Sequence, residues 1–315
     1  MVRAGRMSYF LTESGRRLVF YGSTTLAVGI FSGHYLTHTI GIQYYKNLFQ
    51  AYKNGEERQV SEKLLQRFER AVNLLNLSDF ERKFVNPFMV SGFDVCNAGT
   101  LKSRNGGLVG IPVNFEYDHV NDIDKKDVII RGHKVDWSSE GGKLLEGCLV
   151  LSEDEQVFGM AREIVTMNTN KRLFQAIIPT TGWVFTYSIA SLINQRMNLY
   201  VRPRSLRMVL YTICGLFGYG IYSFAADMSE MYYETDADKK LAALGPQIAD
   251  AGVRFYNKIL QKNVAIRKLT GDDYYTAKGN INYLVRQKAA PLTMRRDFFI
   301  ASLSDLTNDR SEEAS

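Results

Sequence analysis

The amino-acid sequence predicts an α+β membrane protein, in which three transmembrane helices carry a soluble domain of mixed secondary structure. The first observation is that three long stretches, residues 18–45, 173–195 and 208–226, contain no Lys, Arg, Asp or Glu. About 20 apolar residues in a helix cross the hydrocarbon core of a bilayer, where a charge is costly. The second observation is that the remaining long segments show both helical and strand-like patterns. We therefore expect transmembrane helices at 18–38, 173–195 and 208–226, with buried core helices of a soluble protein as the alternative.

The composition excludes several classes of protein. The chain has 315 residues, of which 45% are hydrophobic and 23% charged, which is unlike a disordered or collagen-like chain. Its three cysteines form no CxxC pair, so neither a zinc ribbon nor a disulfide framework is indicated. The net charge is +6, but the basic residues gather beside the apolar stretches, so we expect no nucleic-acid partner. Walker, GxGxxG and GxSxG motifs are absent, and we expect no cofactor and no small-molecule substrate.

Two short basic segments predict how the chain crosses the membrane. Residues 1–17 contain four arginines and one acid, and residues 196–207 contain four arginines and no acid. Short positive segments stay on the inner side of a membrane, so both should lie on the same side. The soluble segments 46–172 and 227–315 then share the opposite side, where they can form one domain interrupted by a membrane hairpin.

The N-terminal segment also indicates a compartment. Its arginines, its Ser and Thr residues and its near lack of acids are typical of a mitochondrial transit or anchor segment. The apolar stretch after it is longer than the core of a usual signal peptide, and no A-x-A cleavage pattern follows. We expect the stretch to be retained, with a bacterial or endoplasmic-reticulum signal anchor as the alternative.

Glycines within the apolar stretches suggest close helix packing. Gly29 and Gly33 form a small-xxx-small pair in the first stretch, and Gly215 and Gly218 lie in the third. Small residues let two helix backbones approach closely in lipid. We expect these glycines to pack among the three spans or against a partner's helix, although glycine is common in such helices in any case.

Helical periodicity marks several segments of the soluble domain. Apolar residues at helical spacing predict a helix over 56–84. A second helix should begin after Ser152, because this residue is a good N-cap and Glu155 completes a capping box three residues later. A further helix should pass through 253–260, and the basic segment 290–299 should be helical towards its end.

Between the first two of these helices the pattern is strand-like. Alternating and β-branched residues, bounded by glycine and asparagine turns, predict strands within 108–117, 127–137 and 145–152. In the second of these strands, alternation places the side chains of His133, Val135 and Trp137 on one face. We expect His133 to be packed there or to stabilise a turn.

Two segments, LSEDEQVFGMAREIVT (151–166) and ETDADKKLAA (234–243), carry a first resemblance to a known family. Their order around a membrane hairpin resembles the membrane zincin metallopeptidases of the HtpX and CAAX prenyl protease type. The resemblance implies a degenerate zincin-like domain. It places Arg162 at the first histidine ligand, Glu163 at the general base, Thr166 at the second histidine, Glu234 at the third zinc ligand and Asp238 at its supporting carboxylate.

The departures from that pattern remove the zinc chemistry. A zincin holds its ion with two imidazoles one helical turn apart, whereas Arg162 is a permanent cation and Thr166 is a poor ligand. We therefore predict a pseudopeptidase without metal, in which Arg162 forms an ion pair with Glu234 or Asp238. The alternatives are that Arg162 and Glu163 are ordinary surface residues, or that the protein is an active metallopeptidase with an unusual site.

A second resemblance covers more of the chain. The blocks GIPVNF, VIIRGHKVDW, LSEDEQVFGMAREIV, GVRFYNKIL and PLTMRRD, between residues 108 and 297, are similar to the transmembrane protein 177 family. The most specific block contains Gly132, His133, Val135, Asp136 and Trp137.

This second resemblance implies a function and a location. The family is implicated in cytochrome c oxidase biogenesis, as a partner of newly made subunit 2 and of the assembly factor that chaperones it. It implies a multi-pass protein of the mitochondrial inner membrane, with the N-terminus in the matrix and the large domain in the intermembrane space. A purely structural membrane anchor is a further alternative.

The remaining histidines and cysteines are weaker candidates. His34 and His38 stand one helical turn apart and could bind a metal ion, but interfacial histidines are the simpler interpretation. Cys96 and Cys148 fall on the same predicted side of the membrane, where we favour free thiols over a disulfide. Cys214 lies within the third predicted span and should be inert.

Overall fold

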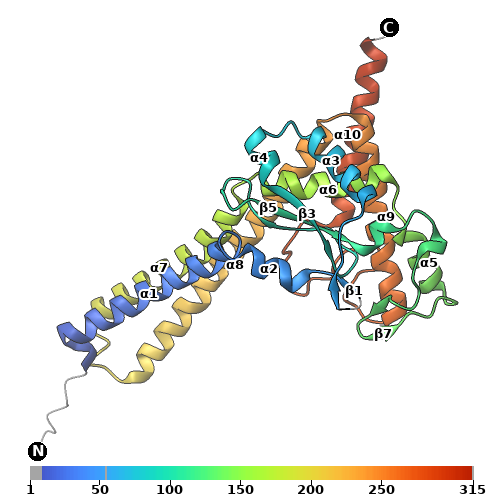
Figure 1. Ribbon diagram of the computed structural model, residues 1–315. Helices are drawn as coiled ribbons and strands as arrows, with labels where there is room; N and C mark the ends of the chain where they lie inside the picture. Colours follow the sequence, from blue (N-terminus) through green and yellow to red (C-terminus); the bar gives the residue numbers. More distant parts are fainter. Residues whose placement is uncertain (1–8, 54, 314–315) are drawn as a thin grey trace, which may run out of the picture. The chain divides into compact units, whose positions relative to one another are not determined.

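The computed structural model describes residues 9–53 and 55–313 (Figure 1). The chain divides into two compact units. We call the first the helical unit; it comprises Met1–Thr37 and Arg172–Ser229. We call the second the mixed unit; it comprises His38–Lys171 and Glu230–Ser315.

Three long helices make up the described part of the helical unit. They are α1 (Glu13–Thr37), α7 (Lys171–Arg196) and α8 (Arg204–Ala242), with a 3-10 turn η1 (Tyr9–Leu11) before them; α8 continues into the mixed unit. In the described residues, α7 and α8 are the two helices long and apolar enough to cross a membrane. The α1 helix lies along α7, where the Trp183 indole N–H donates to the carbonyl and the hydroxyl of Ser23, both at 3.2 Å.

Only one of the predicted packing glycines lies against a neighbouring helix. A Cβ atom on Gly218 would stand 1.8 Å from the Thr186 hydroxyl oxygen, so α8 and α7 approach closely there. A Cβ atom on Gly29, Gly33 or Gly215 would have no described atom within 4 Å. These three glycines therefore do not pack against another described helix, and the expected packing against a partner's helix stays a prediction.

A small three-stranded sheet lies at the centre of the mixed unit. The strand order is β3 (Val85–Val90), β5 (Gly107–Pro112) and β4 (Cys96–Gly99), with β3 parallel and β4 antiparallel to β5. The strand predicted within 108–117 is therefore present, but it ends at Pro112 and continues as the 3-10 turn η2 (Val113–Glu116).

Two short hairpins complete the strands. They are β1 (Tyr52–Lys53) with β2 (Glu56–Glu57), and β6 (Ile129–Ile130) with β7 (His133–Lys134). The long strand predicted at 127–137 is reduced to this second hairpin. Its turn residues Arg131 and Gly132 have φ angles of 51° and 84°, which reverse the chain between the two strands.

The described part of the mixed unit contains seven whole helices besides the end of α8. They are α2 (Ile42–Phe49), α3 (Glu62–Leu74), α4 (Asp79–Phe84), α5 (Glu140–Leu149), α6 (Glu153–Met167), α9 (Pro246–Thr270) and α10 (Leu292–Glu313), together with a 3-10 turn η3 (Val120–Asp122). Of these helices, α2 and α6 pack against the sheet. The predicted helix 56–84 is thus divided into β2, α3 and α4. The break occurs because Ser78 caps a new helix, accepting a hydrogen bond from the Glu81 amide.

The strand predicted at 145–152 was wrong, because most of this segment belongs to α5. Ser139 caps that helix by accepting a hydrogen bond from the Gly142 amide at 3.0 Å. The capping box that begins α6 is confirmed: Glu155 accepts from the Ser152 amide at 2.7 Å, and the Ser152 hydroxyl accepts from the Glu155 amide at 3.4 Å. Two capped helices therefore stand where one strand and one helix were expected.

The α6 helix is the most buried of the helices described in the mixed unit. Twelve of its fifteen residues are buried, because it packs against α3, the sheet and α9 (Figure 1). The core around it joins Phe68 of α3, Ile164 of α6, Phe255 of α9 and Phe299 of α10.

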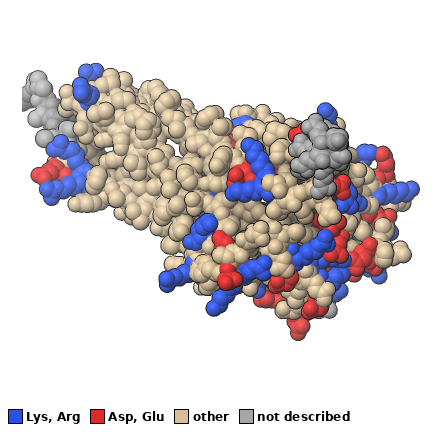
Figure 2. Space-filling model, turned by 90° about the horizontal axis from the view of Figure 1, so that it is seen from above, with Lys and Arg blue, Asp and Glu red and all other residues tan. Residues whose placement is uncertain are grey.

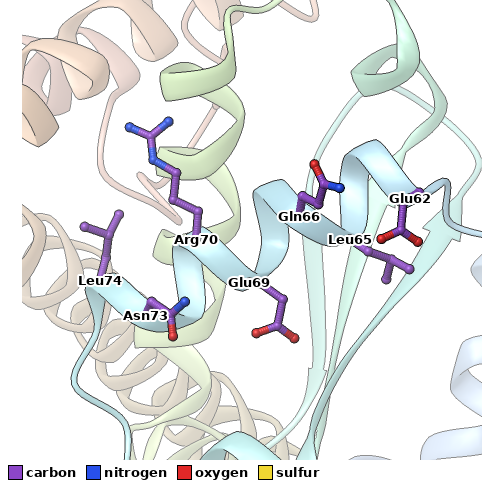
Figure 3. Close-up of a pocket in the computed structure, with 7 residues that line it drawn as sticks. All are labelled: Glu62, Leu65, Gln66, Glu69, Arg70, Asn73 and Leu74. Atoms are coloured by element: carbon purple, nitrogen blue, oxygen red, sulfur yellow. The ribbon is translucent and has the colours of Figure 1, made fainter.

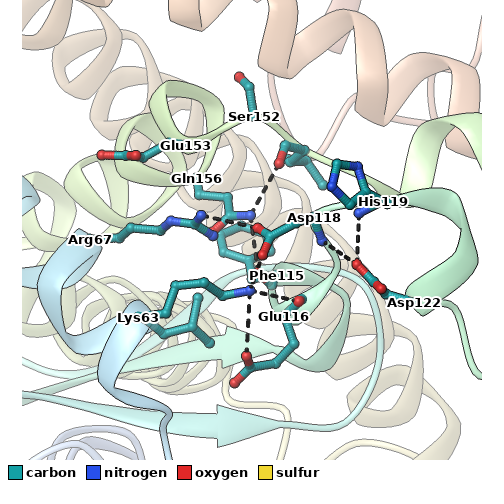
Figure 4. Close-up of polar contacts among 12 residues, drawn as sticks. Lys63, Arg67, Phe115, Glu116, Asp118, His119, Asp122, Ser152, Glu153 and Gln156 are labelled. Atoms are coloured by element: carbon teal, nitrogen blue, oxygen red, sulfur yellow. Dashed lines mark hydrogen bonds and ion pairs between the residues drawn. The ribbon is translucent and has the colours of Figure 1, made fainter.

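A polar network fixes the beginning of α6 (Figure 4). The Gln156 amide donates to the carbonyls of Phe115 and Leu151 at 3.0 and 3.2 Å, and its oxygen accepts from Arg67 at 2.9 Å. Arg67 and Lys63 of α3 also bind the Asp118 carboxylate, at 3.1 and 2.8 Å. The network connects α3, η2 and α6 and satisfies the fully buried Gln156 side chain, as a buried amide requires.

Candidate functional site

The five residues that align with the zincin site come from two helices of the mixed unit. Arg162, Glu163 and Thr166 lie on α6. Glu234 and Asp238 lie one turn apart on the part of α8 that belongs to the mixed unit. Residues four apart share one face of a helix, so both carboxylates point towards the same neighbours.

The centre of this cluster is Arg295 of α10, which the sequence analysis did not single out. Its guanidinium binds the Asp238 carboxylate in bidentate geometry, with Nε 2.6 Å from Oδ2 and Nη2 2.8 Å from Oδ1. Nη1 lies 3.5 Å from Glu234 Oε1. The Arg295 and Asp238 side chains are only 2% and 3% exposed, so this is a buried ion pair.

Tyr256 of α9 and the backbone of Ala290 complete the cluster. The Tyr256 hydroxyl donates to Asp238 Oδ1 at 2.8 Å, and the Arg295 guanidinium lies 5.0 Å from the centre of the Tyr256 ring. The Ala290 amide donates to Glu234 Oε2 at 2.8 Å. Three helices and the segment before α10 therefore meet at two carboxylates.

Burial and charge fix the protonation of Tyr256 and Arg295. Burial raises the pKa of Tyr256, so its hydroxyl keeps the proton that it donates to Asp238. Burial alone would lower the pKa of Arg295, but Tyr256, Asp238 and Glu234 outweigh it and the pKa is raised. The cluster is therefore a fixed cation held by carboxylates.

Arg162 has a different partner from the one predicted. Its Nη1 lies 3.4 Å from Glu163 Oε1 of the same helix, and Glu163 also accepts a hydrogen bond from the Asn97 amide of β4. The expected direct pair with Glu234 or Asp238 was wrong, because Arg295 reaches both carboxylates from α10. Asp238 still affects Arg162 electrostatically. Burial and Arg295 lower the pKa of Arg162, but the combined effect of Tyr256, Glu163 and Asp238 is larger, so the pKa is raised.

The residues at the implied metal positions do not suit a zinc ion. Arg162 brings a cation, and the Thr166 hydroxyl donates to the Arg162 carbonyl at 2.9 Å within its own helix. The Arg295 guanidinium binds both remaining carboxylates. Over the described ranges, no group of three or more His, Cys, Asp or Glu is arranged to hold a metal ion, so His34 and His38 have no such third ligand there.

A cavity of about 270 Å³ adjoins the cluster. Arg162, Glu234 and Arg295 line one part of it, and Lys258 and Lys262 of α9 line another. Two atoms of its lining residues, Arg162 Nε and Asn114 Oδ1, are buried without a hydrogen-bond partner among the described residues. The space beside Arg162 and Glu234 is thus open in part, and Arg295 forms part of its wall.

The Gly132–Trp137 motif belongs to a separate part of the mixed unit. Val135 and Trp137 pack against a second, smaller core, and the Trp137 indole donates to the Lys125 carbonyl at 3.3 Å. The Asp136 carboxylate accepts from the Ser138 amide at 3.0 Å. His133 is exposed on β7, directly after the hairpin turn, so it is not packed, and its expected role in stabilising the turn stays a prediction.

A second hollow lies on the open face of α3 (Figure 3). All of its lining residues belong to this one helix and its end, from Glu62 to Leu74. The side chains of Glu62, Gln66 and Glu69 spread outward rather than meeting at a point (Figure 3). This face is a solvated helix surface, because no second element supplies groups that could converge on a ligand.

Cys148 and Cys214 are free thiols, so the described residues hold no disulfide between Cys96 and Cys148. Cys148 is buried on α5, and burial raises the pKa of its thiol to about 11, which nearby Lys258 and Lys262 offset only in part.

We expect Cys148 to resist alkylation in the folded protein. At pH 8 a thiol with this pKa is ionised to only about one part in a thousand, and the thiolate is the nucleophile. Peptide mass spectrometry after iodoacetamide treatment should show a rate that rises about tenfold per pH unit up to pH 11. Because the thiol has a pKa of about 9 in the unfolded chain and about 11 in the folded protein, it ionises first in the unfolded chain. The free energy of unfolding should therefore fall as the pH rises from about 9 to 11. A rate that levels off near pH 9 would contradict this assignment.

Comparison with known proteins decides the family. The family description "Transmembrane protein 177" matches residues 78–298, which is more than half of the chain. This chain belongs to the transmembrane protein 177 family. The matched range includes α6, the second half of α8 and Arg295 of α10, so the whole buried cluster lies within the family's extent.

Relatives in several vertebrates agree. Transmembrane protein 177 of Xenopus laevis is 33% identical over 290 residues, which cover 88% of this chain and 92% of the relative. The Homo sapiens protein is 33% identical over 216 residues (67% and 69%), and the Rattus norvegicus protein is 30% identical over 275 residues (86% and 88%). No solved structure matches this chain. Membership of the transmembrane protein 177 family, together with the two long apolar helices, makes this a membrane protein.

Proposed function

We propose that this protein is a non-enzymatic factor of the mitochondrial inner membrane that supports cytochrome c oxidase biogenesis. It binds subunit 2 and the assembly factor that chaperones this subunit. Family membership supports this function, because the transmembrane protein 177 resemblance implies both partners. The observation that carries the non-enzymatic part is Arg295, which binds Asp238 and Glu234 where a zincin would bind its metal.

The proposed topology has three spans. Residues 18–38, 173–195 and 208–226 cross the membrane, and residues 1–17 and 196–207 lie in the matrix. The arginines of these two segments support the orientation, and the contact between Trp183 and Ser23 supports α1 as a companion of α7. The segments 46–172 and 227–315 then form one domain in the intermembrane space, built on a degenerate zincin-like scaffold.

The cavity beside the cluster is the proposed contact for a partner segment. Arg162 offers a buried N–H without a partner, and Lys258 offers an ammonium bound only to the Gly147 carbonyl, at 2.7 Å, among the described residues. A buried polar atom without a partner, such as Arg162 Nε, gains most when a partner supplies the missing hydrogen bond. Replacing Arg162 should therefore weaken partner capture while the Asp238–Arg295 pair stays in place.

The test is crosslinking of the full-length protein to subunit 2 in mitochondria. Arg162→Ala is expected to lower the yield of the crosslinked complex several-fold. Arg254→Ala is the matched control, because Arg254 is on α9 but pairs with Asp250 and Asp154 and does not line the cavity. Wild-type protein that captures no subunit 2 would overturn the function; an Arg162→Ala variant that is normal in both capture and stability would overturn the role of the cavity.

Metal analysis separates this function from the metallopeptidase alternative. The purified, detergent-solubilised protein should contain no stoichiometric zinc by mass spectrometry, and the Glu234→Ala variant should have the same metal content. Zinc at one ion per chain that disappears in Glu234→Ala, together with a peptide-cleaving activity lost in Glu163→Gln, would establish the metallopeptidase instead.

A further inference from the structure

The α2 helix exposes an uncharged apolar stripe. Tyr44 and Leu48 are one helical turn apart on α2, and Ile40 lies one further turn back, in the turn that precedes the helix. Their exposed fractions are 81%, 79% and 74%. Side chains spaced by four residues lie on one face of a helix, so Tyr44 and Leu48 share a face, and Ile40 is exposed in the turn just before the helix. We call these three residues the stripe.

The opposite side of α2 holds the helix in this orientation. Ile42 is buried against Phe88, Val90 and Leu108 of the sheet, and Tyr45 packs against the same cluster. The stripe therefore cannot turn inwards without exposing Ile42. The stripe is a fixed surface of the mixed unit.

The charge pattern around the stripe is also unusual for a surface in water. No Lys, Arg, Asp or Glu occurs between Arg17 and Lys46, a run of 28 residues that includes Ile40 and Tyr44. Lys46 itself points its ammonium to Glu57, at 3.4 Å. A helix face that is exposed, apolar and free of charge is typical of a surface that contacts a membrane or another protein.

We propose that the stripe of Ile40, Tyr44 and Leu48 lies in the headgroup region of the bilayer that α7 and α8 cross. Continuity with the helical unit supports lipid as the occupant, because α2 begins only five residues after α1 ends and α1 lies along α7. Tyrosine is enriched at the membrane–water boundary, where its ring is apolar and its hydroxyl reaches water. An apolar helix face without charge matches the hydrocarbon boundary better than a charged protein surface.

The test places spin labels on the full-length protein in vesicles of phosphatidylcholine and phosphatidylethanolamine. Tyr44→Cys and Leu48→Cys are made in a chain whose three native cysteines are replaced by alanine. Glu69→Cys, on the solvated face of α3, is the matched control. Power saturation then compares the collision rates of each label with oxygen, which concentrates in lipid, and with a water-soluble nickel chelate.

Labels at 44 and 48 are expected to show an oxygen-to-nickel collision ratio several-fold higher than the label at 69. A ratio at 44 and 48 equal to that at 69 would overturn the proposal, and so would low collision with both reagents, which indicates cover by protein. Replacement of buried Cys148 could disturb folding, so a second measurement uses the native cysteines. There, Tyr44→Trp should add fluorescence that brominated lipid quenches, whereas Glu69→Trp should add fluorescence that it does not quench.

Discussion

Replacing Asp238 with Ala is expected to destabilise the mixed unit by about 3–5 kcal/mol, the usual cost of leaving a buried charge without its partner. The variant removes both short hydrogen bonds of the Arg295 guanidinium and the acceptor of the Tyr256 hydroxyl. Glu234 cannot replace them, because its only side-chain contact with Arg295 is 3.5 Å long. Urea unfolding of the full-length protein in mild detergent, followed by Trp137 fluorescence in a Trp183→Phe background, measures the change.

Two control variants separate the lost charge pair from lost packing. The double variant Asp238→Leu/Arg295→Met replaces both charges with apolar groups and should recover most of the lost stability, since desolvation offsets much of the attraction in a buried pair. Tyr256→Phe removes one hydrogen bond and should cost only about 1–3 kcal/mol. A single Asp238→Ala variant as stable as the wild type would show that water enters the cluster and solvates Arg295.

The physical reason for a buried pair here is geometric rather than energetic. A buried ion pair adds little net stability, but it accepts only one arrangement of its hydrogen bonds. Arg295 fixes α10 against α8, and Tyr256 fixes α9 against the same carboxylate. The wall of the cavity beside Arg162 is held in place in this way, as the proposed contact with a partner segment requires.

Local signals in the sequence predicted local structure well. The capping box of Ser152 and Glu155 is a contact between residues three apart, and it begins α6 as expected. The pair of Glu234 and Asp238 on one helix face follows from helical spacing in the same way. The prediction of a strand at 145–152 was wrong because the Leu, Val and Cys residues of this segment suit a strand and a buried helix equally. The Ser139 cap, six residues earlier, favours the helix.

Contacts between distant segments could not be read from spacing. Arg295 and Asp238 are 57 residues apart in the sequence, and no local pattern beside either residue predicts the contact. Arg295 lies in the PLTMRRD block, whose sequence indicates only a basic helical segment that is similar to the family. The expected ion pair of Arg162 with Glu234 or Asp238 does not form, because α10 rather than α6 brings a guanidinium to these carboxylates. Gly29 and Gly33 show the same limit, since a small-xxx-small pattern does not say which helix, if any, lies against it.

Replacing Phe158 with Ala is expected to cost about 3–5 kcal/mol, the usual range for deleting a buried aromatic ring. Phe158 is fully buried on α6, and its ring lies 5.4, 5.9 and 5.2 Å from the rings of Phe255, Tyr256 and Phe299. The variant would leave a cavity among α6, α9 and α10. Phe80→Ala is the matched control: Phe80 is 47% exposed on α4 and pairs with Phe84, so its loss should cost less than about 1 kcal/mol.

The aromatic cluster and the ion cluster share Tyr256, and this predicts coupling between them. The Tyr256 ring packs on Phe158 while its hydroxyl donates to Asp238. Combining Phe158→Ala with Tyr256→Phe should therefore deviate from additivity by more than about 0.5 kcal/mol, because the cavity frees the ring to leave Asp238. Strict additivity in the same urea experiment would mean that α10 and the ion pair alone position the tyrosine. A measured coupling would mean that the packing of α6 also sets the geometry of the carboxylates on α8.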